Sequence, residues 1–314
     1  MPYLRRMVTA LRYVHFVGRA SLVILYISLS TFAVLADDEA TAFDDFQRVV
    51  QSPSPKPGQK DMAATALAAM DKGIVFEQQY PQSSHLTGVH NAVKKTLGMV
   101  FGYFGVSIPP NRTADVEACT RRLLVDNTKD DGLQMVLFRM ALKLPVDQQR
   151  PRLKELATGP AGGACSRAQA LLSNLDRIGH PLELSFTSTD GRLVSSSNLK
   201  GKVLLIDFWA PSCGPCVRDF PALKALYKKF KSEGLEIIGL SKDPDEKALK
   251  NYLHKQPLPW PVKYDGSDSA HRISDEYRII EIPVAWLVDR RGVLRDINGR
   301  DDQEQKVESL LKEK

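Results

Sequence analysis

The sequence predicts a mixed α/β domain at its C-terminal end and an all-α helical domain before it. Of the 314 residues, 43% are hydrophobic, so the chain is long enough to form two domains that each bury a core. Over residues 179–314, short apolar runs alternate with amphipathic segments, which is typical of a sheet flanked by helices. Over residues 61–178, apolar side chains recur at helical spacing, and no repeat of fixed period is evident.

Residues 1–36 have the pattern of a targeting segment. Four arginines precede an apolar stretch from Leu22 to Leu35, and Val34-Leu35-Ala36 offers a signal-peptidase site just before acidic residues. An uncleaved signal anchor is the alternative, because the apolar stretch is close to the shortest length that spans a membrane. We therefore expect an exported protein of the periplasm or cell envelope, which an uncleaved leader would anchor to the membrane.

The positive net charge belongs mostly to this leader. The whole chain has 43 basic and 37 acidic residues, a formal net charge of +6, whereas residues 1–36 contain four arginines and no acid. A chain cleaved after Ala36 would keep 39 basic and 37 acidic residues, a net charge of +2. The remaining basic residues are interleaved with acidic ones, so we expect no nucleic-acid partner.

Residues 37–60 are predicted to be a linker, because the segment is acidic at its start and rich in proline after Gln51. The helical residues 61–178 follow, and we expect them to serve as a platform for a partner or for a second copy rather than as a second active site. Cys119 and Cys165 lie in this region, 46 residues apart. In an oxidising envelope they would form a structural disulfide; the alternative is two small buried thiols.

The C-terminal domain is predicted to contain alternating strands and helices that end in a hairpin at residues 289–292. The predicted strands are Leu182–Phe186, Leu193–Ser195, Val203–Phe208, Leu235–Ser241, Pro261–Tyr264, Ala285–Val288 and Val293–Ile297. The predicted helices are Cys216–Lys231, Asp245–Lys255, Ser269–Tyr277 and Asp301–Lys312.

The most informative segment runs from Trp209 to Cys216 and contains the motif Cys-Gly-Pro-Cys. It follows a strand predicted to be buried on both faces, so Cys213 lies at the carboxyl end of that strand and beside the start of a helix. Unpaired N–H groups at a helix start stabilise an anion, and the thiolate is the form of cysteine that attacks disulfides. We therefore expect Cys213 to be the nucleophile and Cys216, one helical turn on, to be the resolving thiol.

Two other roles of a Cys-x-x-Cys pair fit less well. A zinc site needs a second Cys or His pair, and none lies at a suitable spacing, so we expect no metal. An inert structural disulfide is the other alternative. We expect no cofactor beyond a redox-active Cys213–Cys216 disulfide.

Residues 179–314 resemble the thioredoxin fold and, within it, the exported reductases of the TlpA/ResA type. The resemblance rests on the segment from Gly201 through the Cys-Gly-Pro-Cys motif to Pro221, and on Glu281-Ile282-Pro283-Val284 before the strand Ala285–Asp289. The two landmarks are about seventy residues apart and in the family's order. This resemblance implies a thioredoxin-like mixed sheet flanked by helices.

The resemblance also implies roles for particular residues. Pro283 would be the family's cis-proline beside Cys213, and the backbone of Ile282 would pair with a bound substrate strand. Asp207 would be the buried acid beneath the dithiol, with a raised pKa that suits it to take a proton from Cys216. A strand-end acid bonded to a backbone N–H is its alternative role. Asp219 is a second candidate acid, or else a solvated charge in the first helical turn.

The substrate groove is expected to include the residues around these landmarks. The predicted groove residues are Trp209, Ser212, Gly214, Pro215, Ile282, Pro283 and Val284. Two of them depart from the family pattern, since Ser212 replaces an aromatic residue and Val284 replaces a threonine common in thioredoxins.

The function that these patterns indicate is thiol–disulfide exchange, with the chain acting as a protein disulfide reductase. The expected partners are a disulfide-bearing protein substrate and a membrane electron donor, as in relatives that serve cytochrome c maturation. Two alternatives remain. One is a thiol peroxidase, and the other is a redox-sensing module in which the helical region binds a partner.

Overall fold

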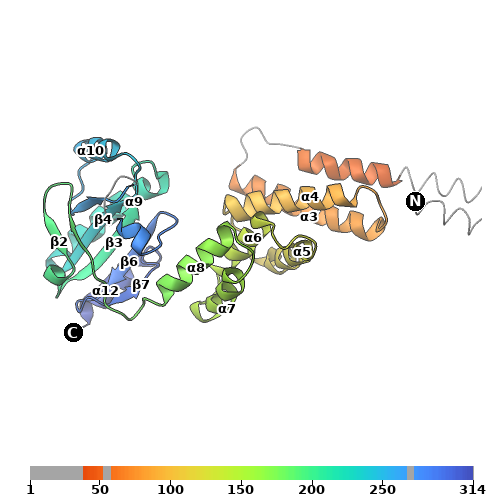
Figure 1. Cartoon of the computed structure of the whole chain (residues 1–314). Coiled ribbons are helices and arrows are strands. Elements are labelled where there is room, and N and C mark those ends of the chain that lie inside the picture. Colours follow the sequence, from red (N-terminus) through yellow and green to blue (C-terminus); the bar gives the residue numbers. More distant parts are fainter. Residues whose placement is uncertain (1–37, 52–57, 267–271, 314) are drawn as a thin grey trace, which may run out of the picture. The chain divides into compact units, whose positions relative to one another are not determined.

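The computed structural model of the chain describes residues 38–51, 58–266 and 272–313. The leader predicted for residues 1–36 lies outside these ranges. Within them, no helix is both long and apolar enough to cross a membrane. The described residues form two compact units that divide between Lys143 and Leu144. Figure 1 labels the helices and strands of both.

The first unit is built from helices, as the sequence predicts. They are α3 (Gln59–Gln79), α4 (Leu86–Leu97), a π-helix (Gly98–Tyr103), α5 (Thr113–Val125) and α6 (Asp131–Ala141). Apolar residues at helical spacing form its core, among them Met70, Phe76, Val89, Val93, Leu97, Phe101, Val116, Leu123, Leu133 and Val136. These buried stripes are the periodic positions that make each helix amphipathic.

Residues 38–51 form a helix, which corrects the prediction of a linker over residues 37–60. The helix buries Phe46, which is 2% exposed, and the ring of Phe43 stacks on that of His85 at 4.0 Å between centroids. Asp38 and Asp44, the kind of residue that suggested a linker, are exposed on this helix. Two aromatic side chains one turn apart are enough to attach a largely polar helix to the unit.

The second unit begins with two helices, α7 (Val146–Ala157) and α8 (Gly163–Leu175), and continues into two sheets. The strands are β1 (Ser185–Thr187), β2 (Leu193–Ser195), β3 (Val203–Trp209), β4 (Leu235–Ser241), β5 (Val262–Tyr264), β6 (Val284–Val288) and β7 (Leu294–Asp296). β1 and β2 form a hairpin, and the other strands form one sheet in the order β5-β4-β3-β6-β7. β3, β4 and β5 are parallel, whereas β6 is antiparallel to β3 and to β7. The prediction of a mixed sheet is therefore confirmed.

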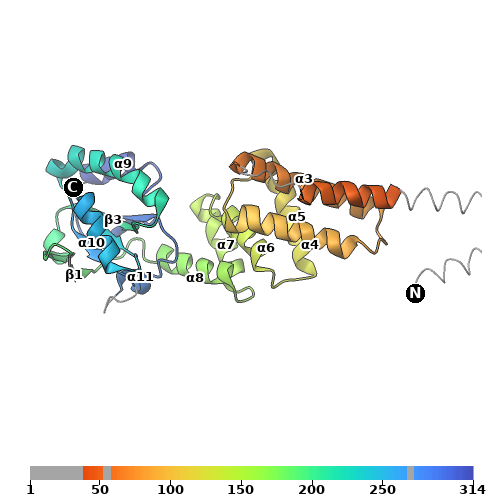
Figure 2. The same ribbon diagram turned by 90° about the horizontal axis from the view of Figure 1, so that it is seen from above.

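Helices cover both faces of this sheet. The remaining helices are α9 (Gly214–Phe230), α10 (Glu246–Lys255), α11 (Ile273–Glu276) and α12 (Gln303–Lys312). Residues of α9, α10 and α12 share one core with alternate residues of β3, and the other core contains residues of α11 and of the β1–β2 hairpin. Figure 2 shows α9 and α11 on opposite sides of β3. β3 is thus enclosed on both faces, and all seven of its residues are buried.

The sequence placed the domain boundary after residue 178, whereas α7 and α8 belong to the second unit. An ion pair joins Arg167 of α8 to Glu281, with 2.7 Å between Nε and Oε1. Just after α8, the guanidinium of Arg177 lies 4.9 Å from the ring centroid of Tyr277. These contacts join residues about a hundred positions apart, which periodicity along the sequence does not reveal.

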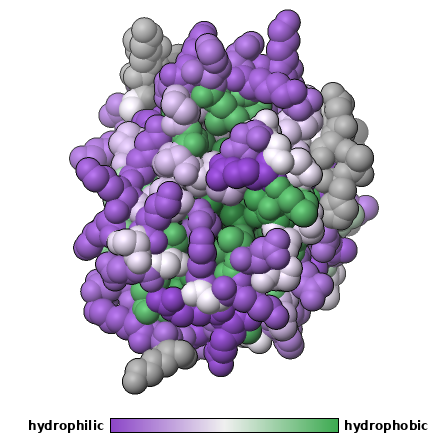
Figure 3. Space-filling view, turned by 90° about the vertical axis from the view of Figure 1, so that its left-hand side faces the viewer, coloured by the Kyte–Doolittle hydropathy of each residue, from purple (hydrophilic) through white to green (hydrophobic). Residues whose placement is uncertain are grey.

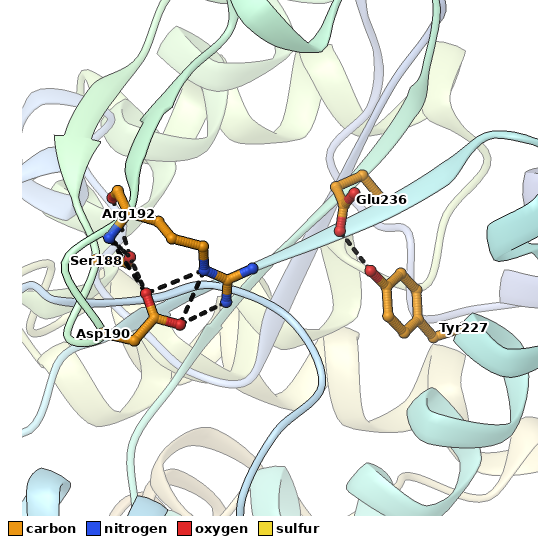
Figure 4. Close-up of polar contacts among 5 residues, drawn as sticks. All are labelled: Ser188, Asp190, Arg192, Tyr227 and Glu236. Atoms are coloured by element: carbon orange, nitrogen blue, oxygen red, sulfur yellow. Dashed lines mark hydrogen bonds and ion pairs between the residues drawn. The ribbon is translucent and has the colours of Figure 1, made fainter.

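Polar contacts stabilise the β1–β2 turn and the attachment of α9 to β4 (Figure 4). In the turn, the carboxylate of Asp190 accepts hydrogen bonds from the hydroxyl of Ser188 (2.5 Å) and from two nitrogens of Arg192. The Arg192 guanidinium lowers the pKa of Asp190. Tyr227 of α9 donates to the carboxylate of Glu236 at 2.6 Å, and burial followed by this contact raises the pKa of the phenol. These groups are satisfied by one another, so we assign them a structural role.

The surface of the second unit drawn in Figure 3 is mostly hydrophilic, and its apolar areas are separated by polar side chains. Leu193 of β2 is 70% exposed, and Ile280, just before the loop that contains Pro283, is 44% exposed. Some exposed apolar side chains are ordinary on a protein surface, so we assign these residues no function.

Candidate active site: the Cys213–Cys216 pair

The dithiol lies where β3 ends and α9 begins. The chain leaves the sheet at Trp209, and the N–H of Cys213 donates to the carbonyl of Ala210 at 3.0 Å, which closes the turn into the helix. Pro215 lies in the first turn of α9, where its missing N–H costs no helical hydrogen bond. The site is therefore held by a buried central strand on one side and by a helix start on the other.

Cys213 and Cys216 are joined by a disulfide bond in this structure. Cys213 is partly exposed, whereas Cys216 is only 1% exposed. Cys213 is the N-cap residue of α9, and its Sγ accepts a hydrogen bond from the N–H of Cys216 at 3.2 Å. After reduction, a thiolate at Cys213 would keep this donor and the positive end of the helix dipole. The asymmetry fits an attacking Cys213 and a shielded Cys216.

The loop before β6 reaches the same end of the sheet. Val284, the first residue of β6, pairs with Phe208 of β3, so the residues before it lie level with the end of β3. The Ile282–Pro283 peptide bond is cis. Ile282 and Cys213 are both partly buried and pack against the same hydrophobic core. The loop is thus positioned beside the dithiol by strand pairing rather than by sequence proximity.

Asp207 is buried in the sheet on the dithiol side. Side chains alternate along β3, so Asp207 shares a face with Val203, Leu205 and Trp209, which pack in one core with Cys216. Its side chain is 1% exposed, and Oδ1 has no hydrogen-bond partner. Burial raises the pKa of Asp207 to about 7, and the nearby Arg300 opposes that rise. A carboxyl with this pKa exchanges protons near neutral pH.

Asp219 is not an isolated charge in solvent, because it pairs with an arginine. It lies on α9 one turn after Cys216, its side chain is 48% exposed, and it forms an ion pair with Arg300. Arg300 also places its NH1 3.6 Å from Oδ1 of Asp207. Arg300 has no distinguishing signal in the sequence, because it lies in a loop far along the chain and belongs to no motif.

The predicted groove residues differ in how far they reach the surface. Ser212, Gly214 and Pro215 are exposed, and the Pro283 loop is partly exposed. The prediction that Trp209 lines the groove is wrong, because its side chain is fully buried. The ring packs edge-on against Phe220, with 4.8 Å between the ring centroids. A side chain enclosed in the core cannot contact a bound protein, so Trp209 supports the site from beneath.

The disulfide considered for Cys119 and Cys165 is absent from the structure. Both are buried free thiols, Cys119 in α5 of the first unit and Cys165 in α8 of the second. Burial raises the pKa of the Cys119 thiol. The Sγ of Cys165 donates to the carbonyl of Ala157 at 3.4 Å, so this thiol already has a partner.

Comparison with known proteins connects this site to a group of oxidoreductases. A model of the AhpC/TSA family matches residues 178–297. The chain is 34% identical over 127 residues to thiol-disulfide oxidoreductase ResA of Bacillus thuringiensis subsp. konkukian, an alignment that covers 40% of this chain and 72% of that protein. It is 30% identical over 112 residues to ResA of Bacillus subtilis strain 168, covering 35% of this chain and 61% of that protein.

Among solved structures, the chain is similar to the thioredoxin domain of a thiol-disulfide oxidoreductase from Bacteroides vulgatus. The two are 28% identical, with a TM-score of 0.38, and the match covers 43% of this chain and 97% of that one.

Proposed function

Because the chain belongs to the family of ResA-type thiol-disulfide oxidoreductases, we propose that it reduces disulfide bonds of proteins in the cell envelope through Cys213 and Cys216. The observation that supports this most directly is the Cys213–Cys216 disulfide at the start of α9, with its outer sulfur partly exposed and its inner sulfur buried. This is the arrangement that two-step disulfide exchange requires.

In the first step, the thiolate of reduced Cys213 attacks one sulfur of a substrate disulfide. A Cys213–substrate bond forms, the substrate S–S bond breaks, and one substrate sulfur leaves as a thiolate. The N–H of Cys216 and the start of α9 stabilise the attacking thiolate. The substrate chain lies against Ile282 and Pro283 in this partly exposed loop, where the backbone of Ile282 pairs with an extended segment.

In the second step, Cys216 releases the substrate. Its thiol proton passes to the carboxylate of Asp207, and the resulting thiolate attacks Sγ of Cys213. The Cys213–Cys216 bond forms, the mixed disulfide breaks, and the second substrate sulfur leaves with the electron pair. Two electrons have moved to the substrate, and the enzyme is left oxidised, with the disulfide that this structure contains.

A dithiol donor must then reduce the enzyme for the next cycle. We place this donor in the membrane and the enzyme outside the cytoplasm, on the basis of the family and of the leader pattern in residues 1–36. The exchange requires no metal and no organic cofactor.

Single cysteine variants test the assignment of the two thiols. With dithiothreitol as donor and a disulfide-linked peptide as substrate, Cys213→Ser should lose turnover. Pre-reduced Cys216→Ser, mixed with the same substrate after the dithiothreitol is removed, should instead accumulate a mixed disulfide that is visible as added mass. The matched control replaces Cys119 and Cys165 with serine and should keep full turnover. Undiminished turnover by Cys213→Ser would refute the proposal.

The reduction potential of the pair tests the direction of electron flow. A value near roughly −270 mV is expected for a reductase, whereas a value near about −120 mV would mean that the enzyme inserts disulfides. Two further outcomes identify the alternative functions. Rapid turnover of hydrogen peroxide would indicate a thiol peroxidase. Oxidation-dependent binding of a partner without turnover would indicate a redox sensor.

A further inference from the structure

One guanidinium lies between two carboxyl groups beside the dithiol. Arg300 places NH1 3.6 Å from Oδ1 of Asp207, and its NH2 forms the ion pair with Asp219. The arginine side chain is only 19% exposed. A largely buried cation interacts more strongly with neighbouring charges than one on the surface, since solvent screens it less.

The position of Arg300 follows from strand pairing. Ala285 of β6 is the partner of Asp207 in the sheet, and its carbonyl accepts the N–H of Gly299 at 2.8 Å. A side-chain carbon on Gly299 would lie 3.0 Å from Cγ of Leu287 and 3.1 Å from the carbonyl oxygen of Ala285. The loop backbone therefore packs closely against β6, and this contact positions the next residue, Arg300, beside Asp207 of the neighbouring strand β3.

Few groups other than Arg300 can influence the charge of Asp207. Its partners on β4 and β6 are Gly239 and Ala285, which carry no charge. The core on the Asp207 face of β3 contains the titratable side chains Cys213, Cys216, Tyr227, Tyr252 and Tyr264. Asp219 of α9 and, from the loop before α12, Arg300 and Asp301 add charged groups. Arg300 lowers the pKa of Asp207 against the effect of burial.

The two acids compete for the same cation. A positive charge within about 4–6 Å favours an ionised carboxyl, so Arg300 makes Asp207 a better proton acceptor at a given pH. The ion pair with Asp219 offsets part of that charge. Asp219 and Arg300 line a pocket between α9 and α12, which Lys229 and Glu304 also line. Solvent therefore reaches the Asp219 side of the arrangement, while Asp207 stays buried.

We propose that Arg300 is a positioning residue that sets the pH range in which Asp207 can accept the proton of Cys216, and that Asp219 tunes this effect by partly neutralising Arg300. The inference rests on the proposed function, because it concerns the proton transfer of the second step. Arg300 itself need not touch the sulfur atoms. It acts through the charge of Asp207.

The direct test is the titration of Asp207 in the oxidised full chain, followed by the carboxyl ¹³C resonance. Oxidation removes both cysteines from the titration. We expect Arg300→Gln to raise the pKa of Asp207 by about one to three units. Arg300→Lys should restore most of the wild-type value, and Asp219→Asn should lower it. Lys229→Met is the matched control, because it breaks the α9–α12 ion pair with Glu304 (2.6 Å) and should leave Asp207 unchanged.

The kinetic test is the pH profile for release of a preformed mixed disulfide at Cys213. In Arg300→Gln the midpoint should move to higher pH by the same amount as the pKa of Asp207, with the plateau rate retained. An unchanged pKa of Asp207 in this variant would overturn the inference. So would a lower plateau with an unshifted midpoint, which would indicate a purely structural role. Failure of the proposed function gives a different result from failure of this inference. In the first case the wild-type protein would not turn over disulfides, but the pKa of Asp207 would still shift in the Arg300 variants.

Discussion

Replacing Asp207 with asparagine should stabilise the second unit, and the gain should grow with pH. Burial raises the pKa of Asp207 from 3.8 to about 7. Each pKa unit corresponds to about 1.4 kcal/mol, so ionising this acid in the folded state costs up to about 4 kcal/mol. An asparagine side chain has nearly the same shape and bears no charge. It removes that cost.

The pH window follows from the two pKa values. Below the unfolded pKa of 3.8 the acid is neutral in both states, and the ionisation cost is absent. As the pH rises toward about 7, the unfolded state loses its proton first, and the wild-type unit loses stability until the folded pKa is passed. The variant avoids this loss. Its advantage should therefore be small at about pH 4 and largest above about pH 7.5.

The measurement is urea unfolding of the oxidised protein, followed by tryptophan fluorescence at acidic and alkaline pH. The chain has three tryptophans, and Trp209, Trp260 and Trp286 are all buried in the second unit, so the signal reports on that unit alone. The difference in unfolding free energy between variant and wild type should increase by a few kcal/mol from about pH 4 to about pH 8. A difference that does not change with pH would refute the reasoning.

The matched control is Asp289→Asn, which should show the opposite sign. Asp289 is 3% exposed; burial alone would raise its pKa, but the N–H of Val293 and the guanidinium of Arg295 outweigh that effect and lower it. Its ionised form therefore stabilises the fold above the unfolded pKa, and this contribution is lost as the pH falls. The asparagine variant should be destabilised most at neutral and alkaline pH.

Two further substitutions test the packing of the units. Gly102→Val places a side-chain carbon 2.6 Å from the carbonyl oxygen of Gly132. It should destabilise the first unit by about 1–3 kcal/mol in a thermal melt followed by circular dichroism. The control is Gly88→Ala, whose added carbon meets nothing within 4 Å, and this variant should melt no earlier than wild type. Tyr277→Phe removes the hydrogen bond to the carbonyl of Glu183 but keeps the ring against Trp286, so it should cost the second unit about 0.5–1.5 kcal/mol in urea unfolding by fluorescence. A loss that is equal in Gly88→Ala, or no loss in Tyr277→Phe, would contradict these explanations.

The sheet was largely predictable because its central strands carry a local signal. β3 and β4 are mostly apolar, and their observed bounds differ from the predicted ones by at most one residue. The helix over residues 38–51 was not predicted, because its apolar contacts rest on Phe43 and Phe46 while polar and charged residues make up most of its sequence. Two apolar side chains give too weak a hydrophobic periodicity to distinguish a helix from a linker in the sequence.

The division of the chain was less predictable than its elements. Along the sequence, α7 and α8 have the same periodicity as the helices before them, so the pattern joins them to the all-α region. In the structure α7 packs on α8, Arg167 of α8 pairs with Glu281, and Arg177 just after α8 lies over the ring of Tyr277. Such pairs have no characteristic spacing. Only the three-dimensional contacts separate the two groups of helices.

The active site shows the same limit at the level of single residues. Cys213, Cys216 and Pro283 were predicted because their chemistry is tied to residue type and local order. Arg300 was not, since an arginine in a loop has no distinguishing signal until strand pairing brings it to a buried acid. Arg300 matters through its effect on Asp207. Without Arg300, Asp207 would be surrounded by apolar groups and would keep its proton to higher pH. Without Asp219, Arg300 would favour the ionised form of Asp207 more strongly. We therefore propose that the proton acceptor of this site is a group of three side chains, from β3, α9 and the loop before α12, rather than one acid.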